Sequence, residues 1–432
     1  IAEAADDFTR IALKAKAAKD YFLLVGPPGT GKTSCALKKM VETFYKEEGA
    51  QILLLSYTNR AVDEICKALS SIRPEVDFIR VGSELSCDEN YRDHLIENEL
   101  ATCMRRTEVC ERINRCRILV GTVASISGKP ELFRLKHFDV AIVDEATQIL
   151  EPQLLGILCA KGENGKEGVG KFILIGDHKQ LPAVVLQNSE QSEVYDEALS
   201  AVGLKNLKDS LFERLYRTAR QHTDAHRTYD MLCRQGRMHP EVALFANQAF
   251  YEGRLLPVGL PHQLEDSGNI NRLSFYPSQP EPMGSSAKTN HSEAKIAARL
   301  AATVYKEHSE AFDASRTLGI ITPYRSQIAL VKKEIEALGI PELNQILIDT
   351  VERFQGSERD VIIYSFCVNY PYQLKFLSNL TEEDGILIDR KLNVALTRAR
   401  KQMLLTGVPT LLERNPLYKS LLKLIESLRN IA

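Results

Sequence analysis

The sequence lacks any apolar run near the roughly 20 residues that a membrane-spanning helix needs. It also lacks an N-terminal basic region followed by an apolar stretch, so we expect no secretory signal peptide and no membrane partner. Neither sign of charge predominates, because the net charge is −2 over 432 residues. This balance excludes a wholly basic surface, although it leaves room for a narrow basic groove. No internal repeat of solenoid period is present.

Paired cysteine motifs are also missing. The nine cysteines are scattered without a single C-x-x-C pair. An odd, unpatterned set in a chain of this size indicates reduced thiols and a cytoplasmic setting, or a nuclear one in a eukaryote. The sequence begins with Ile1 rather than Met. We therefore expect either a monomer or part of a larger multidomain protein.

What the sequence does contain is a regular alternation of short apolar runs with helix-forming segments. A chain of this length is too long for a single core, and the alternation is typical of α/β folds with parallel sheets. Two sets of strands are predicted. The first comprises 21–25, 52–56, 78–81, 118–121, 140–144 and 172–176, and the second comprises 318–322, 346–350, 361–366 and 403–406.

These two sets of strands predict two α/β domains, at residues 1–227 and 228–432. Residues 82–116 interrupt the first domain and have the composition of a helical insertion. Residues 257–292 interrupt the second and are rich in Pro, Gly, Ser and Asn, which predicts a long surface loop.

A phosphate-binding loop is predicted directly after the first strand. The segment GPPGTGKT fits the pattern G-x-x-x-x-G-K-[ST], and helix-forming residues follow it. Glycines allow backbone N–H groups to close around phosphate oxygens, and the helix N-terminus favours negative charge. Lys32 would reach the β- and γ-phosphates of ATP. The predicted nucleotide-binding residues are Gly26, Pro27, Gly29, Thr30, Gly31, Lys32 and Thr33.

Two adjacent acids end the buried strand at 140–144. Strand ends of parallel sheets meet at one edge, where ligands bind in α/β folds. We predict that Asp144, together with the hydroxyl of Thr33, holds Mg²⁺, and that Glu145 accepts a proton from the attacking water. Gln180 follows the next strand and is a candidate sensor of hydrolysis, although a strand-end turn would account for it equally well.

Nine segments then occur in an order that resembles the motifs of superfamily 1 helicases, type B. The resemblance covers nearly the whole chain, and it is closest to the branch that contains the nonsense-mediated-decay RNA helicase and the Okazaki-fragment nuclease-helicase, with the second nearer. The segments are GPPGTGKT, SYTNRAVDE, VGTVAS, VDEATQ, GDHKQLP, RQGRMHP, ITPYRSQ, TVERFQGSERD and NVALTRAR.

This resemblance implies two RecA-like domains with the ATP site in the cleft between them. It also implies that Arg237 and Arg398 reach the γ-phosphate from the second domain, where an always-charged planar donor suits developing charge. Gly356 and Glu358 would contact phosphate and ribose. A charge on a surface helix remains the alternative for Arg398 considered alone.

The same resemblance implies a track for single-stranded nucleic acid across both domains. Contacts to phosphates at such strand ends position the strand without reading its sequence. Tyr57 and Tyr324 could stack on bases or simply pack against the core. The predicted nucleic-acid contacts are Thr58, Asn59, Arg60, Thr122, Ser125, Tyr324 and Thr350.

The sequence departs from the family's pattern at the base pocket. The family has a glutamine upstream of the phosphate-binding loop, but no glutamine precedes Gln51 here, so either the sequence begins too late to include it or the protein lacks that contact. Gly236 stands where the family has a tyrosine that stacks on the base. We therefore expect loose selectivity among nucleoside triphosphates, because the phosphate contacts remain.

Four cysteines lie between the two nucleotide motifs, namely Cys87, Cys103, Cys110 and Cys116. An iron–sulfur cluster would need all four thiolates to converge. Packing as small apolar residues is the alternative.

The resulting expectation is an ATP-dependent helicase that moves 5′ to 3′ along single-stranded DNA, with ATP and Mg²⁺ as cofactors. The polarity comes from the resemblance alone. An RNA or RNA–DNA helicase is one alternative, because phosphate contacts do not separate the two polymers. The other is an ATPase that remodels nucleic-acid complexes without unwinding.

Overall fold

The protein is described from a computed structural model that covers residues 2–221, 228–266, 268, 270–282, 285–383 and 385–429. Contacts between Cα atoms divide the chain into two compact units. The first contains residues up to His178 together with Pro182–Cys233, and the second contains Lys179–Leu181 together with Arg234 onward. Along the described part of the chain, no helix combines the length and apolar character needed to cross a bilayer.

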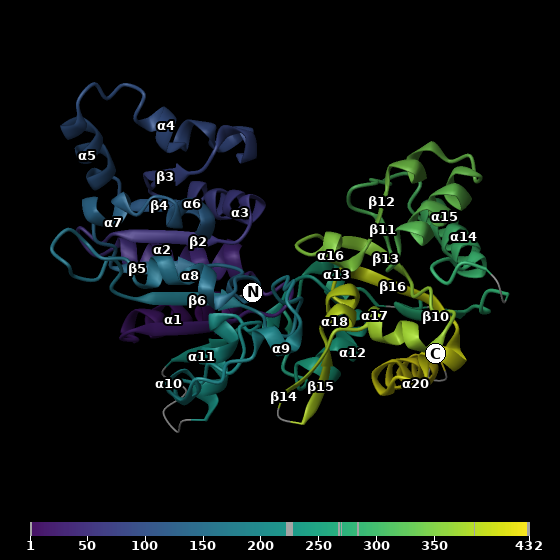
Figure 1. Ribbon diagram of the computed structural model, residues 1–432. Helices are drawn as coiled ribbons and strands as arrows, with labels where there is room; N and C mark the ends of the chain where they lie inside the picture. The colour runs from purple at the N-terminus through teal and green to yellow at the C-terminus, as the bar shows by residue number, and fades with distance from the viewer. Residues whose placement is uncertain are drawn as a thin grey trace. The chain divides into compact units, whose positions relative to one another are not determined.

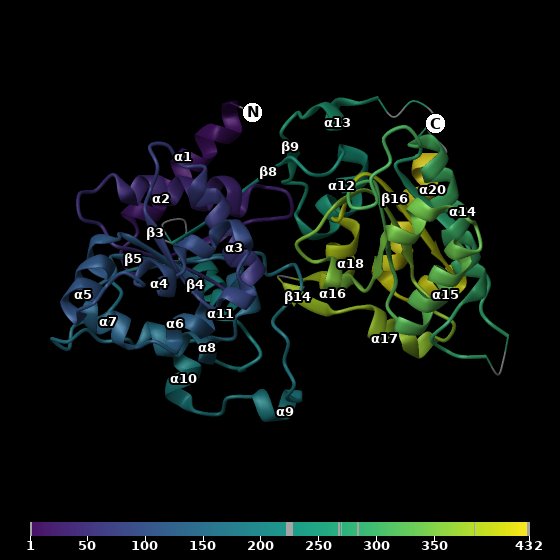
Figure 2. The ribbon, with the colours of Figure 1, turned by 90° about the horizontal axis from the view of Figure 1, so that it is seen from above.

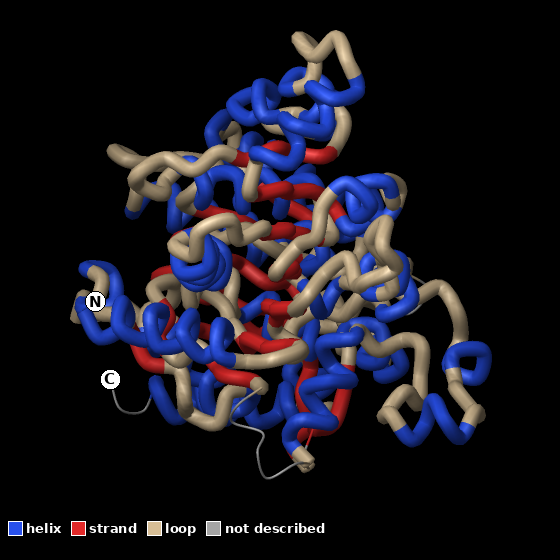
Figure 3. The backbone as a smooth tube through the Cα atoms, turned by 90° about the vertical axis from the view of Figure 1, so that its left-hand side faces the viewer, coloured by secondary structure: helices blue, strands red, loops and turns tan. Residues whose placement is uncertain are grey.

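The first unit is built on a sheet of seven parallel strands in the order β3-β4-β2-β5-β6-β1-β7, which Figure 3 shows in red among blue helices. The six strands predicted for this region are confirmed to within one residue at their ends. The strands are β1 Tyr21–Val25, β2 Ile52–Ser56, β3 Phe78–Val81, β4 Ile118–Thr122, β5 Val140–Val143, β6 Phe172–Gly176 and β7 Tyr229–Met231.

Helices cover both faces of this sheet (Figure 1). Alternate residues of β1 show why: Phe22 and Leu24 pack with α1, α2 and α3, whereas Leu23 and Val25 pack with α6, α8 and α11. Its helices are α1 Ala2–Ala17, α2 Lys38–Tyr45, α3 Asn59–Ser70, α4 Ile96–Glu99, α5 Arg106–Arg115, α6 Val123–Ser127, α7 Glu131–Leu135, α8 Glu151–Leu158, α9 Ser189–Ser192, α10 Glu197–Ala201 and α11 Leu211–Arg220.

The second unit contains a sheet of five parallel strands in the order β10-β16-β13-β11-β12. Two small pairs, β8–β9 and the antiparallel β14–β15, accompany it. The strands are β8 Arg234–Gln235, β9 Leu256–Pro257, β10 Leu273–Pro277, β11 Leu318–Ile321, β12 Leu347–Asp349, β13 Arg359–Ser365, β14 Leu380–Glu383, β15 Ile386–Asp389 and β16 Ala399–Gly407.

The alanine-rich helix α14 packs with α15 on one face of this second sheet, as Figure 2 shows at its right-hand side. Small side chains such as Ala297 and Ala301 allow close approach, and both are fully buried. The helices are α12 Pro240–Phe250, α13 Pro261–Leu264, α14 His291–Glu307, α15 Arg325–Glu336, α16 Val351–Phe354, α17 Leu374–Leu377, α18 Arg390–Leu396, α19 Pro409–Leu412 and α20 Pro416–Arg429.

Two expectations about organisation need correction. Residues 228–233 were expected in the second domain, but Tyr229–Met231 pairs with β1 and completes the first sheet. Residues 257–292 were expected to form a surface loop, yet they include the edge strand β10, whose Leu273 and Phe275 are buried. In both places three to five residues pair with a strand remote in sequence, and such short segments carry little periodicity of their own.

Candidate nucleotide and nucleic-acid site

The phosphate-binding loop follows β1 at the carboxyl edge of the first sheet. Gly29 and Gly31 adopt φ values of 72° and 76°, a left-handed region that disfavours residues with a Cβ atom. The half-buried side chain of Lys32 folds back over Gly26, where a Cβ atom would lie 2.1 Å from Lys32 Cγ. Thr30 donates its hydroxyl to the carbonyl of Pro27 at 2.7 Å, so its side chain stabilises the turn.

Asp144, immediately after β5, lies against the loop. The hydroxyl of Thr33 donates to one oxygen of its carboxylate, and the backbone N–H of Glu145 donates to the other at 2.9 Å. Burial raises the pKa of Asp144, whereas the Thr33 bond and the charge of Lys32 oppose that rise. Two oxygen ligands side by side, facing a lysine, fit the donor set that Mg²⁺ prefers in nucleotide sites.

Glu145 occupies the next position with a left-handed φ of 52°, a strained conformation for a glutamate. Burial, and then the neighbouring Asp144, raise its pKa to about 7, while Lys32 and Arg60 act in the opposite direction. Its carboxyl can therefore exchange a proton near neutral pH. This is the property required of a general base.

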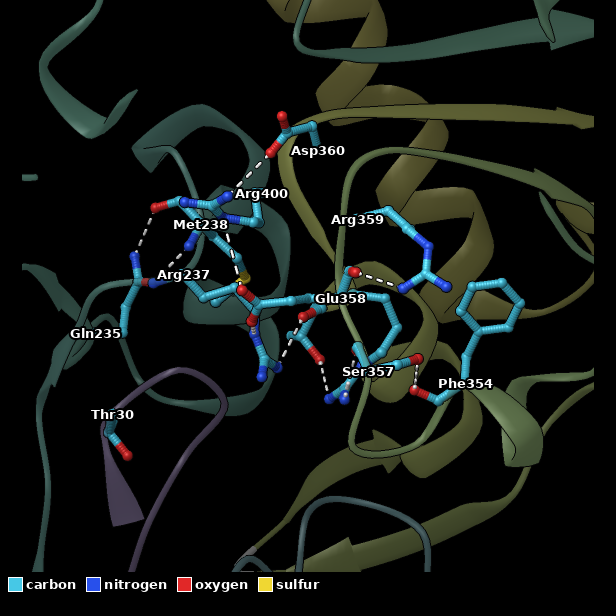
Figure 4. A network of polar contacts seen from close by, with 12 residues as sticks. Thr30, Gln235, Arg237, Met238, Phe354, Ser357, Glu358, Arg359, Asp360 and Arg400 are labelled. Carbon is cyan, nitrogen blue, oxygen red and sulfur yellow. Dashed lines mark hydrogen bonds and ion pairs between the residues drawn. The ribbon is translucent and has the colours of Figure 1, made fainter. Parts of the chain in front are cut away.

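In the second unit, Arg237 is held by Glu358. The guanidinium donates from Nε to the Glu358 carboxylate and from Nη1 to the carbonyl of Thr397 at 3.3 Å (Figure 4). Arg400 approaches the other oxygen of Glu358 at 3.6 Å and pairs with Asp360 at 3.1 Å. Burial alone would raise the pKa of Glu358, but the surrounding arginines lower it below its ordinary value.

The loop that carries Arg237 is fixed by two buried amides that the sequence analysis did not single out. Gln235 accepts from the backbone N–H groups of Arg237 and Met238, at 3.0 and 2.7 Å, and donates to the Met238 carbonyl (Figure 4). Gln263 donates to the carbonyls of Gln235 and Met238, both at 2.9 Å. Gln235 lies within the segment RQGRMHP and Gln263 lies outside the nine segments, but the sequence does not show that their amides hold the loop, so the fold reveals this role.

Arg398 is 2% exposed and is bonded to its own unit. It donates to the carbonyl of Val394 at 2.9 Å, to that of Ser357 at 3.4 Å and to the side-chain oxygen of Gln180 at 3.3 Å. Gln180 belongs to Lys179–Leu181, the short segment that is grouped with the second unit. The candidate sensor of hydrolysis, Gln180, therefore lies in the same unit as Arg398. Burial to this extent does not fit the alternative of a charge on a surface helix.

Gly356 is exposed and has a φ of 78°, so a glycine is required there by backbone conformation. It lies two residues before Glu358, whose carboxylate already binds two arginines. The geometry therefore gives Glu358 a role in positioning Arg237, which the sequence analysis had not assigned to it.

The predicted nucleic-acid contacts of the first unit divide into two groups. Thr58 and Arg60 are exposed and Asn59 is half-buried, all at the start of α3, so they remain accessible. Thr122 is 6% exposed, and its hydroxyl caps α6 by accepting from the N–H of Ser125 at 3.0 Å. The hydroxyls of Thr122 and Ser125 also bond to each other at 2.7 Å, so Thr122 primarily stabilises a helix terminus.

The remaining predicted contacts lie on the second unit. Thr350 is half-buried after β12, and Tyr324 is half-buried after β11. The hydroxyl of Tyr324 accepts from the amide of Gln373 at 3.1 Å, and burial raises its pKa. The ring of Tyr324 thus packs within its unit, which favours the packing alternative, whereas Tyr57 in the first unit is 42% exposed.

The four cysteines of the insertion do not converge. Cys116 is buried and directs its thiol to the carbonyl of Ile118 at 3.2 Å, and Cys87 is buried near Arg80. Across the residues that the structure describes, no group of three or more Cys, His, Asp or Glu side chains could hold a metal ion. The iron–sulfur alternative is therefore not supported.

Comparison with known proteins gives matches over most of the chain. Models of the AAA domain match residues 207–410 and, in two overlapping parts, residues 5–109 and 98–188. The "DNA replication ATP-dependent helicase/nuclease DNA2" of Gallus gallus is 30% identical over 410 residues, which cover 93% of this chain and 36% of that protein. The chain belongs to the superfamily 1 helicases.

Two further relatives agree with this family. The DNA2 protein of Homo sapiens is 29% identical over 443 residues, 93% of this helicase chain and 37% of the human protein. The "DNA polymerase alpha-associated DNA helicase A" of Saccharomyces cerevisiae is 26% identical over 482 residues, 95% of this chain and 65% of the yeast protein. The predicted branch is confirmed, and the helicase chain spans little more than a third of the DNA2 proteins it matches.

Proposed function

We propose that this chain hydrolyses ATP and uses the energy to move 5′ to 3′ along single-stranded DNA, separating the strands of duplexes. The observation that carries the proposal is the arrangement at the carboxyl edge of the first sheet, where Thr33 bonds Asp144 beside Lys32 and Glu145 follows. This arrangement combines a phosphate-binding loop, a site for a divalent cation and a base that titrates near neutrality.

In the proposed reaction, backbone N–H groups of the loop and the ammonium of Lys32 bind the phosphates of ATP. Thr33 and Asp144 would hold Mg²⁺, which when bound neutralises charge on the phosphate oxygens. Glu145 accepts the proton of the attacking water, since burial raises the pKa of its carboxyl to about 7. The site residues of the first unit therefore account for binding and for proton transfer.

The second unit would supply positive charge to the transferred phosphoryl group. Arg237 is the better placed candidate, because Glu358 and the Gln235 loop fix its guanidinium while leaving it 15% exposed. Arg398 would act together with Gln180, to which it is bonded. We propose that these arginines act on ATP bound at the phosphate-binding loop and that hydrolysis releases them.

DNA is the proposed polymer because the relatives named above are DNA helicases. Thr58, Asn59 and Arg60 on the first unit and Thr350 on the second would contact its phosphates. RNA remains the second candidate, since these contacts do not distinguish the sugars. We propose that the protein works where such polymers are found, in the cytoplasm or the nucleus.

The proposal is tested by ATP hydrolysis measured with no polymer, with single-stranded DNA and with single-stranded RNA. We expect single-stranded DNA to stimulate hydrolysis several-fold more than RNA, and Lys32→Ala to abolish the activity in all three conditions. Stimulation by RNA alone would show that RNA, rather than DNA, is the substrate. An absence of stimulation by either polymer would refute a motor.

A further inference from the structure

An exposed aromatic segment of the second unit takes no part in the site described above. Tyr372 is 56% exposed and Phe376 is 64% exposed. They lie four positions apart in a continuous helical stretch formed by Pro371–Gln373 and α17. Residues at this spacing lie on one face of a helix, so both exposed side chains belong to the same face of this stretch. Large aromatic side chains bury much apolar area in a core, so two of them side by side in solvent call for an explanation.

The ring of Tyr372 has a stacking partner although it is exposed. Tyr370 stacks on Tyr372 with a centroid distance of 5.8 Å and an angle of 13° between the rings. Beneath them, the Gln373 side chain accepts from the N–H groups of Asn369 and Tyr370 at 2.9 and 3.0 Å. Since Asn369 and Gln373 are 6% and 1% exposed, the exposed rings rest on a buried polar support.

The same two amides join this segment to two others at the carboxyl edge of the second sheet. Gln373 donates to the carbonyl of Ala287 at 2.7 Å and to the Tyr324 hydroxyl at 3.1 Å, and Asn369 donates to the carbonyl of Thr289 at 2.7 Å. Tyr324 follows β11, and Asn369 follows β13. Ligands of parallel α/β sheets bind at this edge, where Thr350 also lies.

The joined segments also carry exposed cations. Lys375 follows Tyr372 by three residues and therefore lies beside it on the helix. Arg325 follows Tyr324, and the carbonyl of Lys288 accepts from Ser326 at 3.1 Å. All three cations are exposed, and no carboxylate of the described chain pairs with any of them. Aromatic rings flanked by unpaired cations are complementary to the bases and phosphates of an unpaired strand.

We propose that Tyr372 and Phe376 form a base-stacking platform for single-stranded nucleic acid, with Lys375, Arg325 and Lys288 bound to the adjoining phosphates. The inference rests on the proposed function and adds to it a contact with the bases, where the residues predicted from the motifs contact only phosphates. Stacking is possible with every base, so the platform would bind the strand without selecting a nucleotide sequence. A protein-binding surface is the competing use of exposed aromatic rings, and the experiment separates the two.

The test compares binding of a fluorescent oligothymidine of 20 nucleotides with binding of an abasic oligomer of equal length and charge. For the wild-type protein we expect tighter binding of oligothymidine. Tyr372→Ala and Phe376→Ala should each weaken that binding by about 5-fold or more, the usual effect of losing one stacked base. Binding of the abasic oligomer should be unchanged, and Tyr372→Phe should retain wild-type affinity because its ring remains.

Tyr195→Ala is the matched control, since Tyr195 is an aromatic residue of the first unit that is 80% exposed. It should leave both affinities unchanged, and thermal unfolding should show that every variant is folded. Equal binding of oligothymidine by wild type, Tyr372→Ala and Phe376→Ala would overturn the platform and favour a protein partner, with the proposed motor unaffected. If the wild-type protein binds neither oligomer, the proposed function itself is wrong and the platform falls with it.

Discussion

The hydroxyl of Thr33 donates a hydrogen bond to the carboxylate of Asp144, although 111 positions separate the two residues in the sequence. The bond joins the helix that follows the phosphate-binding loop to the end of β5. It places two oxygen ligands of the proposed cation site next to each other. Such preorganisation reduces the cost of assembling a cation site when ATP binds.

Replacement of this hydroxyl tests the cation site. We expect Thr33→Ala to lower kcat for ATP hydrolysis by about 10-fold or more, because a hydrogen bond or ligand to a charged centre is lost. The concentration of Mg²⁺ needed for half-maximal activity should rise. Thr33→Ser keeps the hydroxyl and should remain close to wild type. An unchanged Mg²⁺ dependence in Thr33→Ala would contradict the assignment.

The raised pKa of Glu145 predicts a pH dependence. A base must be ionised, and the pKa of this carboxyl is about 7. Therefore kcat should rise with pH between about 6 and 8 and then level off. Glu145→Gln should still bind ATP, but its kcat should be lower than that of wild type by about 100-fold or more. Its kcat should also lack the rise with pH that is expected for the wild type. A Glu145→Gln variant that keeps the wild-type pH profile would exclude Glu145 as the base.

Arg237 and its partner Glu358 make a paired prediction. Arg237→Lys keeps the charge but loses the planar donor set, so kcat should fall by about 10³-fold while ATP binding changes little. Glu358→Gln should lower kcat less, since Gln235 and Gln263 still hold the loop. Arg400→Ala removes the other arginine beside Glu358 and serves as the control. Equal losses in all three variants would indicate a structural defect.

Gly236, which stands where the family has a stacking tyrosine, predicts that GTP, CTP and UTP are hydrolysed at rates within about 10-fold of ATP, because single hydrogen-bond pairs to the base change binding by about 1.5 kcal/mol or less. Gly236 leaves no ring to stack on the base, and an added Cβ there would lie 3.1 Å from Leu260. The measurement is kcat/KM for each of the four nucleotides. A preference for ATP above about 100-fold would show that other residues read the adenine.

Glu293 predicts a pH-dependent stability in the second unit. It is fully buried and accepts from Ser365 at 2.7 Å and from the N–H of Cys367 at 2.8 Å, and burial raises its pKa to about 7. The folded state therefore binds a proton that the unfolded state releases between its usual pKa of 4.5 and 7. The free energy of unfolding should then fall as pH rises through that interval.

Glu293→Gln removes this titration and provides the measurement. Between pH 6 and pH 8.5, wild type should lose about 1 kcal/mol of unfolding free energy relative to the variant. Glu281→Gln is the control, because it alters a neighbouring carboxylate that bonds to the ring of His291. Its unfolding free energy should follow the wild-type pH dependence more closely than that of Glu293→Gln does. Parallel curves for wild type and Glu293→Gln would show that the Glu293 carboxyl does not titrate in this range.

Much of the fold could be predicted from the sequence, because buried parallel strands are continuous apolar runs. The strand Ile52–Ser56 is an example, since all five of its residues are buried and its bounds were predicted without error. The phosphate-binding loop was equally predictable, because its glycines and lysine recur at fixed spacing. The helical insertion after β3 also appears as short helices, from Glu84–Ser86 to α5.

What could not be predicted depends on contacts remote in sequence. The edge strand Tyr229–Met231 has three residues, and only its pairing with β1 identifies it. The nucleic-acid contact of Thr122 stays a prediction, but the capping of a helix by its hydroxyl could not be predicted, because any strand-end threonine can take that role. The pairing of Arg237 with Glu358 bridges 121 positions, so neither residue alone indicates it.

The central claim is that ATP hydrolysis drives directional movement that separates strands. The most direct measurement is unwinding of duplex DNA carrying a single-stranded tail at either the 5′ or the 3′ end, with ATP present. We expect unwinding of the 5′-tailed duplex, none of the 3′-tailed duplex, and no unwinding by Glu145→Gln. ATP hydrolysis stimulated by DNA without unwinding of either duplex would contradict the claim and favour a remodelling ATPase.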